Sequence, residues 1–117
     1  MAIDLQEMQA LDLWRRAVVT TVAGDGPDLS GRQMAVLLTV YLTAPPHTVR
    51  GLAQVLKVAK PAITRALDRL GARDLVRRRT DEADRRSVLV QCTARGYVFL
   101  REFGETITAA ARAVDRG

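Results

Sequence analysis

The sequence contains one cysteine, one histidine and five aromatic residues among its 117 positions. The single cysteine, Cys92, excludes an internal disulfide, and His47 stands alone, too far along the chain to complete a metal-ligand spacing with it. Because aromatic side chains are so scarce, the core must be built from leucine, valine, alanine and isoleucine, and the 48% apolar content is sufficient for one. No metal site is expected.

Other features are missing as well. No apolar run approaches the ~20 residues that span a bilayer, and the acidic N-terminal stretch lacks the basic start of a signal peptide. We therefore expect no membrane association and a cytoplasmic protein associated with the nucleoid. The chain also has no glycine-rich phosphate loop, no paired catalytic acids and no nucleophile motif, which argues against an enzyme and against a cofactor.

The length suits a single domain over residues 1–117, and positive charge is concentrated in one part of it. The net charge is +5, yet residues 1–49 carry three arginines against five acids, and residues 102–117 carry two against three. Residues 50–101 carry thirteen lysines and arginines against five acids. This distribution is typical of a phosphate-binding module inside a scaffold that does not touch the polyanion, although a solvated basic surface gives the same pattern.

Hydrophobic periodicity predicts two helices in the first part of the chain. Apolar residues recur at three- and four-residue spacing from about Ile3 to Ala23, and the glycine-rich stretch 24–28 ends that helix. Ser30 and Gln33 have the spacing of a capping box for a second, very apolar helix that runs to about Leu42. Pro45 and Pro46 follow it and prevent its continuation.

The middle of the chain predicts two shorter helices and then a hairpin. Thr48 can cap a short helix that ends before a turn at 57–59, and Pro61 suits the first turn of a helix to about Ala72. After Asp74 the pattern changes to two strands, 75–79 and 87–92, joined by a polar stretch. Thr93 then caps a last helix to about Val114. The predicted order is helix, helix, helix, helix, strand, strand, helix.

Two short helices joined by a tight turn and followed by an arginine-rich hairpin describe a winged helix-turn-helix. The predicted fold class is therefore mainly α with a small β-hairpin (α+β). The second helix of such a pair fits the DNA major groove and offers its N-terminal outer face to base edges. The guanidinium groups of the hairpin pair well with phosphates and are attracted to a narrow minor groove.

At this point the sequence resembles the MarR-type transcription regulators. The resemblance starts at Leu52-Ala53 and is densest in the stretch from Pro61 to Leu70. It continues through Leu75-Val76-Arg77-Arg78 and the wing residues Asp84-Arg85-Arg86, and ends at Thr93-Ala94-Arg95-Gly96. The resemblance implies homodimeric, sequence-specific binding of double-stranded DNA through residues 48–93. The sequence departs from the family at Lys60, Asp74 and Cys92, where a cap residue, glycine and leucine are commoner.

The resemblance also implies residue roles. Thr64 and Arg65, with Lys60 and Ala62, match the exposed start of the recognition helix, and Arg86 matches a wing arginine that Asp84 steadies. The full set of expected DNA-binding residues is Lys60, Ala62, Thr64, Arg65, Arg69, Arg77, Arg79, Asp84, Arg85 and Arg86. Arg69 could equally be a structural ion-pair partner, and at least one of Arg77, Arg78 and Arg79 is expected to pair locally, for example with Asp68 or Asp74.

Family members dimerise through long terminal helices, which here correspond to residues 1–23 and 94–115. We expect the interface to include Leu5, Met8, Leu11, Trp14, Phe103 and Ile107. The resemblance also raises a small-molecule effector as a partner. The competing hypothesis is a winged-helix module that binds another regulator or the transcription machinery through its first helix. Cys92 is expected to be a small buried hydrophobe, with a redox sensor as the alternative.

Overall fold

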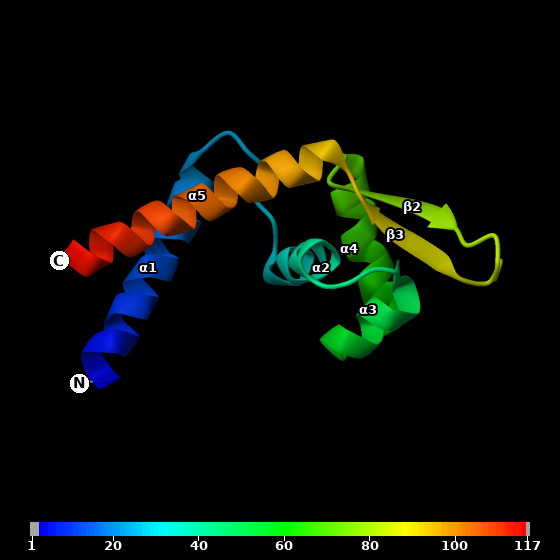
Figure 1. The fold of residues 1–117 in the computed structure, drawn as a ribbon, viewed down its shortest axis with the longest axis horizontal. Coiled ribbons are helices and arrows are strands. Elements are labelled where there is room, and N and C mark those ends of the chain that lie inside the picture. The colour runs from blue at the N-terminus through cyan, green and yellow to red at the C-terminus, as the bar shows by residue number, and fades with distance from the viewer. Residues whose placement is uncertain (1–2, 117) are drawn as a thin grey trace. The chain divides into compact units, whose positions relative to one another are not determined.

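The structure is a computed structural model that describes the backbone of residues 3–116 and the side chains of residues 6–115. Two compact units are formed, one by residues 29–98 and one by the chain before and after that range. The elements, shown in Figure 1, are α1 (Ile3–Ala23), α2 (Gly31–Leu42), β1 (His47–Thr48), α3 (Val49–Leu56), α4 (Lys60–Ala72), β2 (Val76–Thr80), β3 (Val88–Cys92) and α5 (Ala94–Arg116). The predicted mainly helical class with a β-hairpin is confirmed.

Hydroxyl side chains begin three of the helices, as the sequence predicts. The Gln33 N–H donates to the Ser30 hydroxyl at 3.1 Å, and the Gln33 side chain accepts from the Ser30 N–H at 3.0 Å, which completes the capping box of α2. Thr48 accepts from the Gly51 N–H at the start of α3, and Thr93 accepts from the Gly96 N–H at the start of α5. Each hydroxyl satisfies an amide that the first helical turn leaves without a partner.

The turns around α4 use the left-handed backbone region at two residues that are not glycine. Lys57 ends α3 with a φ of 57°, and Asp74 precedes β2 with a φ of 56°. Asp74 is the position where the family more often has glycine, and the positive φ gives the reason for that preference. Helix α4 begins without a side-chain cap, because its N-cap residue is Ala59.

The sheet of residues 29–98 has three antiparallel strands in the order β1-β3-β2. Strands β2 and β3 form the predicted hairpin, with Val76 opposite Cys92 and Thr80 opposite Val88. The prediction of only two strands is wrong, because His47 and Thr48 pair with Val90 and Leu89 of β3. Two residues just before a helix cap are too short a run to show strand periodicity, so pairing with β3 defines this strand.

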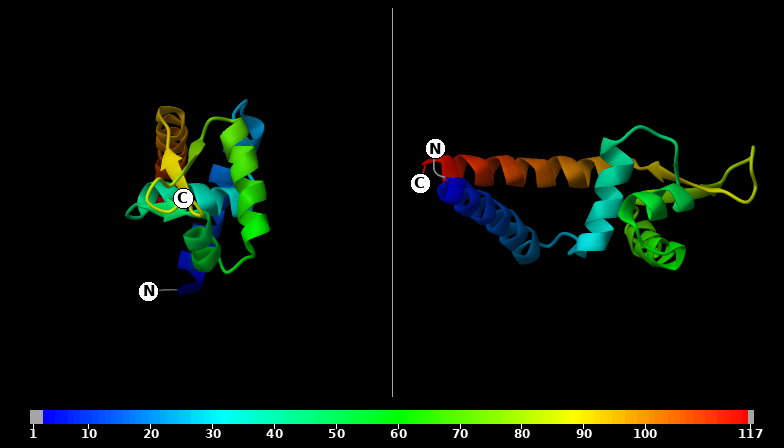
Figure 2. Two further views of the ribbon diagram at one scale, coloured as in Figure 1. Left: turned by 90° about the vertical axis from the view of Figure 1, so that its right-hand side faces the viewer. Right: turned by 90° about the horizontal axis from the view of Figure 1, so that it is seen from below.

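The core of this unit lies between α2, α3, α4 and the base of the sheet. Its completely buried side chains are mostly leucine, as the scarcity of aromatics requires: Val36, Leu37, Leu52, Ile63, Leu67, Leu70 and Leu75. Helix α4 supplies the largest share of them. Figure 2 shows the hairpin extending beyond α3 and α4, so the base of the sheet is buried and its far end is solvated.

Tyr41 connects α2 through hydrogen bonds to the two segments that flank the hairpin. Its hydroxyl donates to the Leu75 carbonyl at 2.6 Å and accepts from the Thr93 N–H at 2.9 Å. The Thr93 hydroxyl in turn donates to the Asp74 carbonyl at 2.7 Å. A Cβ atom added at Gly96 would overlap the Tyr41 hydroxyl and lie 2.5 Å from the Leu75 carbonyl oxygen. The glycine of the Thr-Ala-Arg-Gly motif therefore makes room for this hydrogen-bonded junction.

The second unit consists of α1 and the part of α5 from Phe99 onward. Trp14 packs edge-on against Phe103, with ring centroids 6.2 Å apart, and Ala17 and Ala110 are buried. Phe103, a predicted interface residue, is only 7% exposed, because Trp14 and Phe99 pack against it, and little of its ring is left for contact with a second chain. Among the described residues, no helix is long and apolar enough to cross a membrane.

Much of the apolar surface of α1 faces solvent. The exposed large hydrophobic residues among the described part of this helix are Met8, Leu11, Trp14, Val18, Val19 and Val22. We call this set the α1 stripe. The predicted interface residues Met8, Leu11 and Trp14 belong to it, and Ile107 on α5 is half-buried. The predicted interface residue Leu5 has a side chain outside the described part of the chain.

Candidate nucleic-acid interface

Helix α4 presents a polar face along two adjacent rows of residues. Lys60, Thr64 and Asp68 are spaced four apart, as are Arg65 and Arg69, and all five residues are exposed. The opposite face of the helix is buried in the core. Lys60, Thr64, Arg65 and Arg69 thus lie on the solvent side of the helix, as the sequence predicts.

Ala62 is different. It was expected on the outer face, but it is 8% exposed and falls in the buried row that continues through Ala66 and Leu70. The expected outward position of Ala62 is therefore wrong. Ala62 precedes Ala66 by four residues and Leu70 by eight, which places it on the same face as these core residues, and its small apolar side chain allows close packing near the start of the helix.

The three arginines of β2 point to both faces of the hairpin. Successive side chains alternate along a strand, so Arg77 and Arg79 share one face and Arg78 lies on the other. Arg78 pairs with Asp68 of α4, with a guanidinium-to-carboxylate distance of 2.8 Å. The prediction that one of these arginines pairs locally is confirmed, and Arg77 and Arg79 are both exposed.

The loop at the end of the hairpin is organised by its acidic residues. The Asp84 carboxylate accepts from the Arg86 N–H at 3.1 Å and lies 3.6 Å from the Arg86 Nε. The Asp81 carboxylate accepts from the Ala83 N–H at 3.0 Å. In both turns an aspartate carboxylate accepts a hydrogen bond from the backbone N–H two residues further on, and this stabilises the short polar loop. The Arg86 side chain is nevertheless 93% exposed, so the carboxylate lies beside the guanidinium without covering it.

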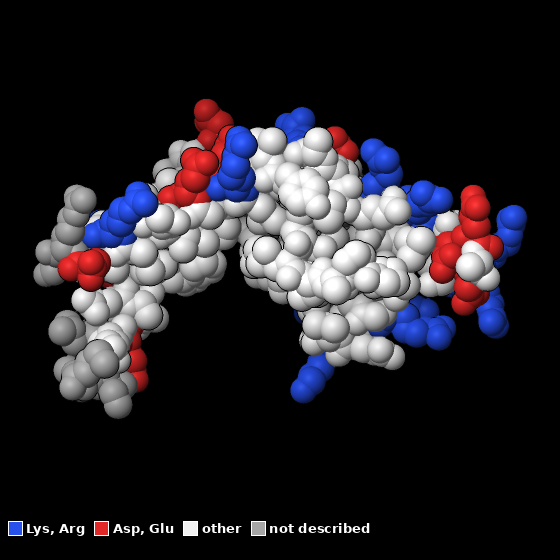
Figure 3. All heavy atoms as spheres, viewed as in Figure 1, with Lys and Arg blue, Asp and Glu red and all other residues white. Residues whose placement is uncertain are grey.

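Basic side chains lie over much of the surface of the unit formed by residues 29–98. Figure 3 shows lysine and arginine spheres over the α3, α4 and hairpin region, and a mixed cluster of both signs at the far end of the hairpin. The mixed cluster corresponds to the loop that contains Asp81, Glu82, Asp84, Arg85 and Arg86. Asp81 and Asp84 accept hydrogen bonds from the loop backbone, and the arginines of β2 carry the positive charge along the hairpin.

Two further basic residues lie at the two ends of α3 and were missed from the sequence. Arg50 lies in the first turn of α3, and Lys57 lies in the turn between α3 and α4, and both are exposed. In a helix-turn-helix the first helix of the pair crosses the phosphate backbone, so these two cations are candidates for phosphate contacts. The sequence signal that could have identified them is their position at the two ends of the first helix of the pair.

The comparison with known proteins identifies the family. The MarR family model matches residues 29–88, which is just over half of the chain. The chain belongs to the MarR family. As a MarR-family protein, it is a DNA-binding transcription regulator and not an enzyme. None of the curated proteins matches its sequence.

Solved structures share the fold of this MarR-family chain. A MepR mutant from a multidrug-resistant S. aureus clinical isolate has a TM-score of 0.81 at 18% identity, covering 99% of this chain and 83% of that one. A mutant MarR from E. coli in complex with operator DNA gives 0.68 at 24%, with coverages of 94% and 74%. CouR from Rhodococcus jostii RHA1, bound to p-coumaroyl-CoA, gives 0.63 at 26%, with coverages of 92% and 70%.

Proposed function

We propose that the protein binds a pseudo-palindromic DNA site as a homodimer, with α4 of each protomer in the major groove and each hairpin at the adjacent minor groove. The observation that carries the proposal is the outer face of α4, where Thr64 and Arg65 are exposed beside Lys60 while the opposite face is locked into the core. A helix with side chains is ~10–12 Å across and the major groove is ~12 Å wide, so one such face fits the groove.

Within this proposal, Arg65 and Thr64 read bases. An arginine pairs bidentately with the O6 and N7 atoms of guanine, and a threonine methyl contacts the thymine methyl group. Arg69 lies one helical turn further on and is exposed, so it suits a phosphate contact at the groove edge. Asp68 is held by Arg78 at 2.8 Å, which keeps its carboxylate away from phosphates and joins α4 to β2.

The hairpin supplies the second contact. Arg86 is almost completely exposed near the end of the hairpin, and Asp84 lies beside it, which suits insertion into a narrow minor groove. Arg85, Arg77 and Arg79 are exposed and suit the flanking phosphates. Asp81 and Asp84 use their carboxylates to hold the loop backbone, which gives the loop its shape.

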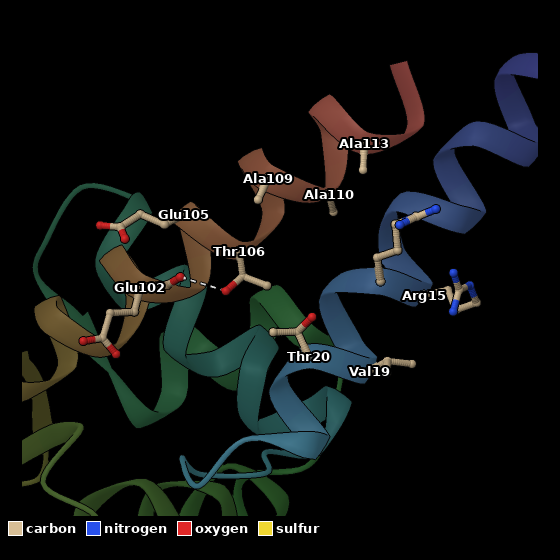
Figure 4. A pocket seen from close by; sticks show the side chains of 10 residues that line it. Arg15, Val19, Thr20, Glu102, Glu105, Thr106, Ala109, Ala110 and Ala113 are labelled. Carbon is tan, nitrogen blue, oxygen red and sulfur yellow. Dashed lines mark hydrogen bonds between the residues drawn. The ribbon is translucent and has the colours of Figure 1, made fainter. Parts of the chain in front are cut away.

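The α1 stripe supports dimerisation. Six large apolar residues exposed on one helix exceed what an isolated domain of this size needs on its surface. Beside the stripe, α1 and α5 enclose a groove of about 670 Å³. Figure 4 shows small side chains of α5 at this groove, among them Thr106, Ala109, Ala110 and Ala113. Small residues let another helix approach closely, which suits the terminal helices of a second copy.

Selection of genomic DNA fragments on the purified protein tests the proposal. We expect enrichment of sites with two related half-sites about 34–36 Å apart, or a multiple of that spacing, centre to centre. Thr64→Ala should change the selected sequence, whereas Arg85→Ala should weaken binding to all fragments alike. Selection of no fragment would refute DNA binding, and it would favour the alternative of a protein-interaction module acting through the α1 stripe.

A further inference from the structure

The ion pair between Asp68 and Arg78 connects the two elements of the proposed DNA interface. The Arg78 Nη2 atom donates to the Asp68 Oδ1 atom at 2.8 Å. Asp68 lies one helical turn after Thr64 in the same row of α4, and Arg78 is the middle residue of β2. The pair therefore joins the proposed base-reading face of α4 directly to the hairpin.

Strand β3 of the hairpin is held from several sides. It is the central strand of the sheet, and its residues Leu89 and Val90 pair with β1. The Val90 side chain is buried in the core. Just after the strand, the Thr93 N–H donates to the Tyr41 hydroxyl at 2.9 Å. The position of β3 is thus fixed by backbone pairing, by burial and by the Tyr41 junction.

Strand β2 lies at the edge of the sheet and is held at fewer points. Val76 is its one buried residue, and the four residues that follow are exposed. Within the described part of the chain, the Arg78 pair is the one side-chain hydrogen bond or ion pair between β2 and a helix. Strands in two-stranded ribbons twist about each other more than strands in larger sheets. The pair therefore limits how far β2 can roll about β3.

The restraint matters because the loop residues lie further out along the hairpin, whose far end extends beyond α3 and α4 (Figure 2). Thr80 ends β2 four residues after Val76, about 13 Å away at ~3.3 Å per residue. A tilt of about 10° at the base would displace that end by about 2 Å, whereas a binding site tolerates a displacement of about 0.5 Å. A small change of hairpin angle would thus misplace Arg86.

We propose that Asp68 and Arg78 are positioning residues for DNA binding. Their ion pair sets the angle between α4 and the hairpin, so that α4 and Arg86 meet their two grooves together. An exposed pair adds little to stability, and these side chains are 59% and 35% exposed, so its contribution is geometric. The DNA-binding part of this inference rests on the proposed function, whereas the hairpin angle is a property of the free protein.

The hairpin angle is tested first, without DNA, by residual dipolar couplings of the backbone amides. In the wild type, the couplings of α4 and of the hairpin should fit one common alignment. Asp68→Asn keeps the size of the side chain and removes its charge, and it should change the couplings of β2 relative to those of α4. Identical relative couplings in the wild type and in Asp68→Asn would overturn the proposal.

The matched control is Glu82→Gln. Glu82 is exposed in the hairpin loop and has no ion pair among the described residues, so this variant makes the same charge change without touching the Arg78 pair. Its couplings should equal those of the wild type. A change in Glu82→Gln as large as that in Asp68→Asn would assign the effect to charge and overturn the role of the pair.

DNA affinity then separates positioning from charge by its sign. Loss of a negative charge strengthens binding to a polyanion, so Glu82→Gln should bind a selected fragment at least as tightly as the wild type. Asp68→Asn should instead bind it about tenfold more weakly, the effect of losing one good contact. Tighter binding by Asp68→Asn would overturn the proposal. Failure of the wild type to bind any fragment would refute the proposed function instead, and the dipolar couplings decide the hairpin angle in either case.

A double-variant cycle assigns the effect to the hairpin. In an Arg86→Ala background the hairpin contact is already lost, so Asp68→Asn should change the affinity by less than about twofold. In an Arg65→Ala background, which removes a contact of α4 alone, the loss of about tenfold should remain. Equal losses in the two backgrounds would show that the pair does not act through Arg86 and would overturn the positioning role.

Discussion

The substitution Gly96→Ala tests the junction at which Tyr41 joins α2 to the flanks of the hairpin. In an ordinary helix this change stabilises, because alanine exceeds glycine in helix propensity by roughly 1 kcal/mol. At Gly96 the new Cβ atom overlaps the Tyr41 hydroxyl and approaches the Leu75 carbonyl oxygen to 2.5 Å. We therefore expect the opposite sign, a loss of stability.

The size of the loss follows from the contacts. Overpacking costs about 1–3 kcal/mol, and displacing the Tyr41 hydroxyl leaves the Leu75 carbonyl and the Thr93 N–H without their partner at a further cost of about 1–3 kcal/mol. Both groups belong to buried residues. After subtraction of the propensity gain of roughly 1 kcal/mol, the free energy of unfolding should fall by about 1–5 kcal/mol.

Urea denaturation of the purified protein measures this change. Gly71→Ala is the matched control, because a Cβ atom there meets nothing within 4 Å, and it should be neutral or stabilising. Tyr41→Phe should lower the free energy of unfolding by itself. The double variant with Gly96→Ala should lose less than the sum of the two single losses, because both changes break the same hydrogen bonds. A stabilising Gly96→Ala, or strict additivity of the pair, would refute the role assigned to Tyr41.

Three further predictions concern ion pairs and the α1 stripe. Asp68→Asn should lower stability by less than about 1 kcal/mol, because the Arg78 pair is partly exposed; a loss several times larger in urea denaturation would contradict this. Hydrogen bonds from Arg16, and secondly from Arg15, lower the pKa of the Asp12 carboxyl below its ordinary value of 3.8. The stability that the ionised carboxylate contributes to the fold is therefore present above that value, and it is lost as the pH falls through the lower pKa of the folded protein. A carboxyl NMR titration should show this lowered pKa, and Arg16→Gln should raise it. Leu11→Glu should shift sedimentation toward the monomer while the control Val55→Glu does not, and equal behaviour of the two variants would exclude the α1 stripe from the interface.

Local chemistry made most of the fold predictable. Ser30, Thr48 and Thr93 are cap residues whose function depends only on the next three residues, so helix starts could be inferred from sequence. The period change after Asp74 likewise located the hairpin. Strand β1 could not be inferred, because pairing with β3 across some forty residues defines it.

The candidate site was predictable to a similar degree. Motif resemblance and spacing identified the outward residues of α4 and the wing acid beside Arg86, but the small residue Ala62 gave no polarity signal to separate core from surface. The Tyr41 junction depends on segments about fifty residues apart, and no local pattern encodes that proximity. The packing of Phe103 against Trp14 within one chain could not be inferred either, because it joins helices that are far apart in the sequence.

The salt dependence of DNA affinity tests the central claim most directly. Fluorescence anisotropy on a selected fragment should give a linear plot of the logarithm of the association constant against that of salt concentration, with a slope of about −0.9 for each phosphate neutralised. Arg86→Ala should weaken binding and reduce the slope by about one phosphate, whereas Arg101→Ala, an equal charge change on α5, should leave both nearly unchanged. Equal effects of the two variants, or a wild-type affinity that ignores salt, would contradict the proposed interface.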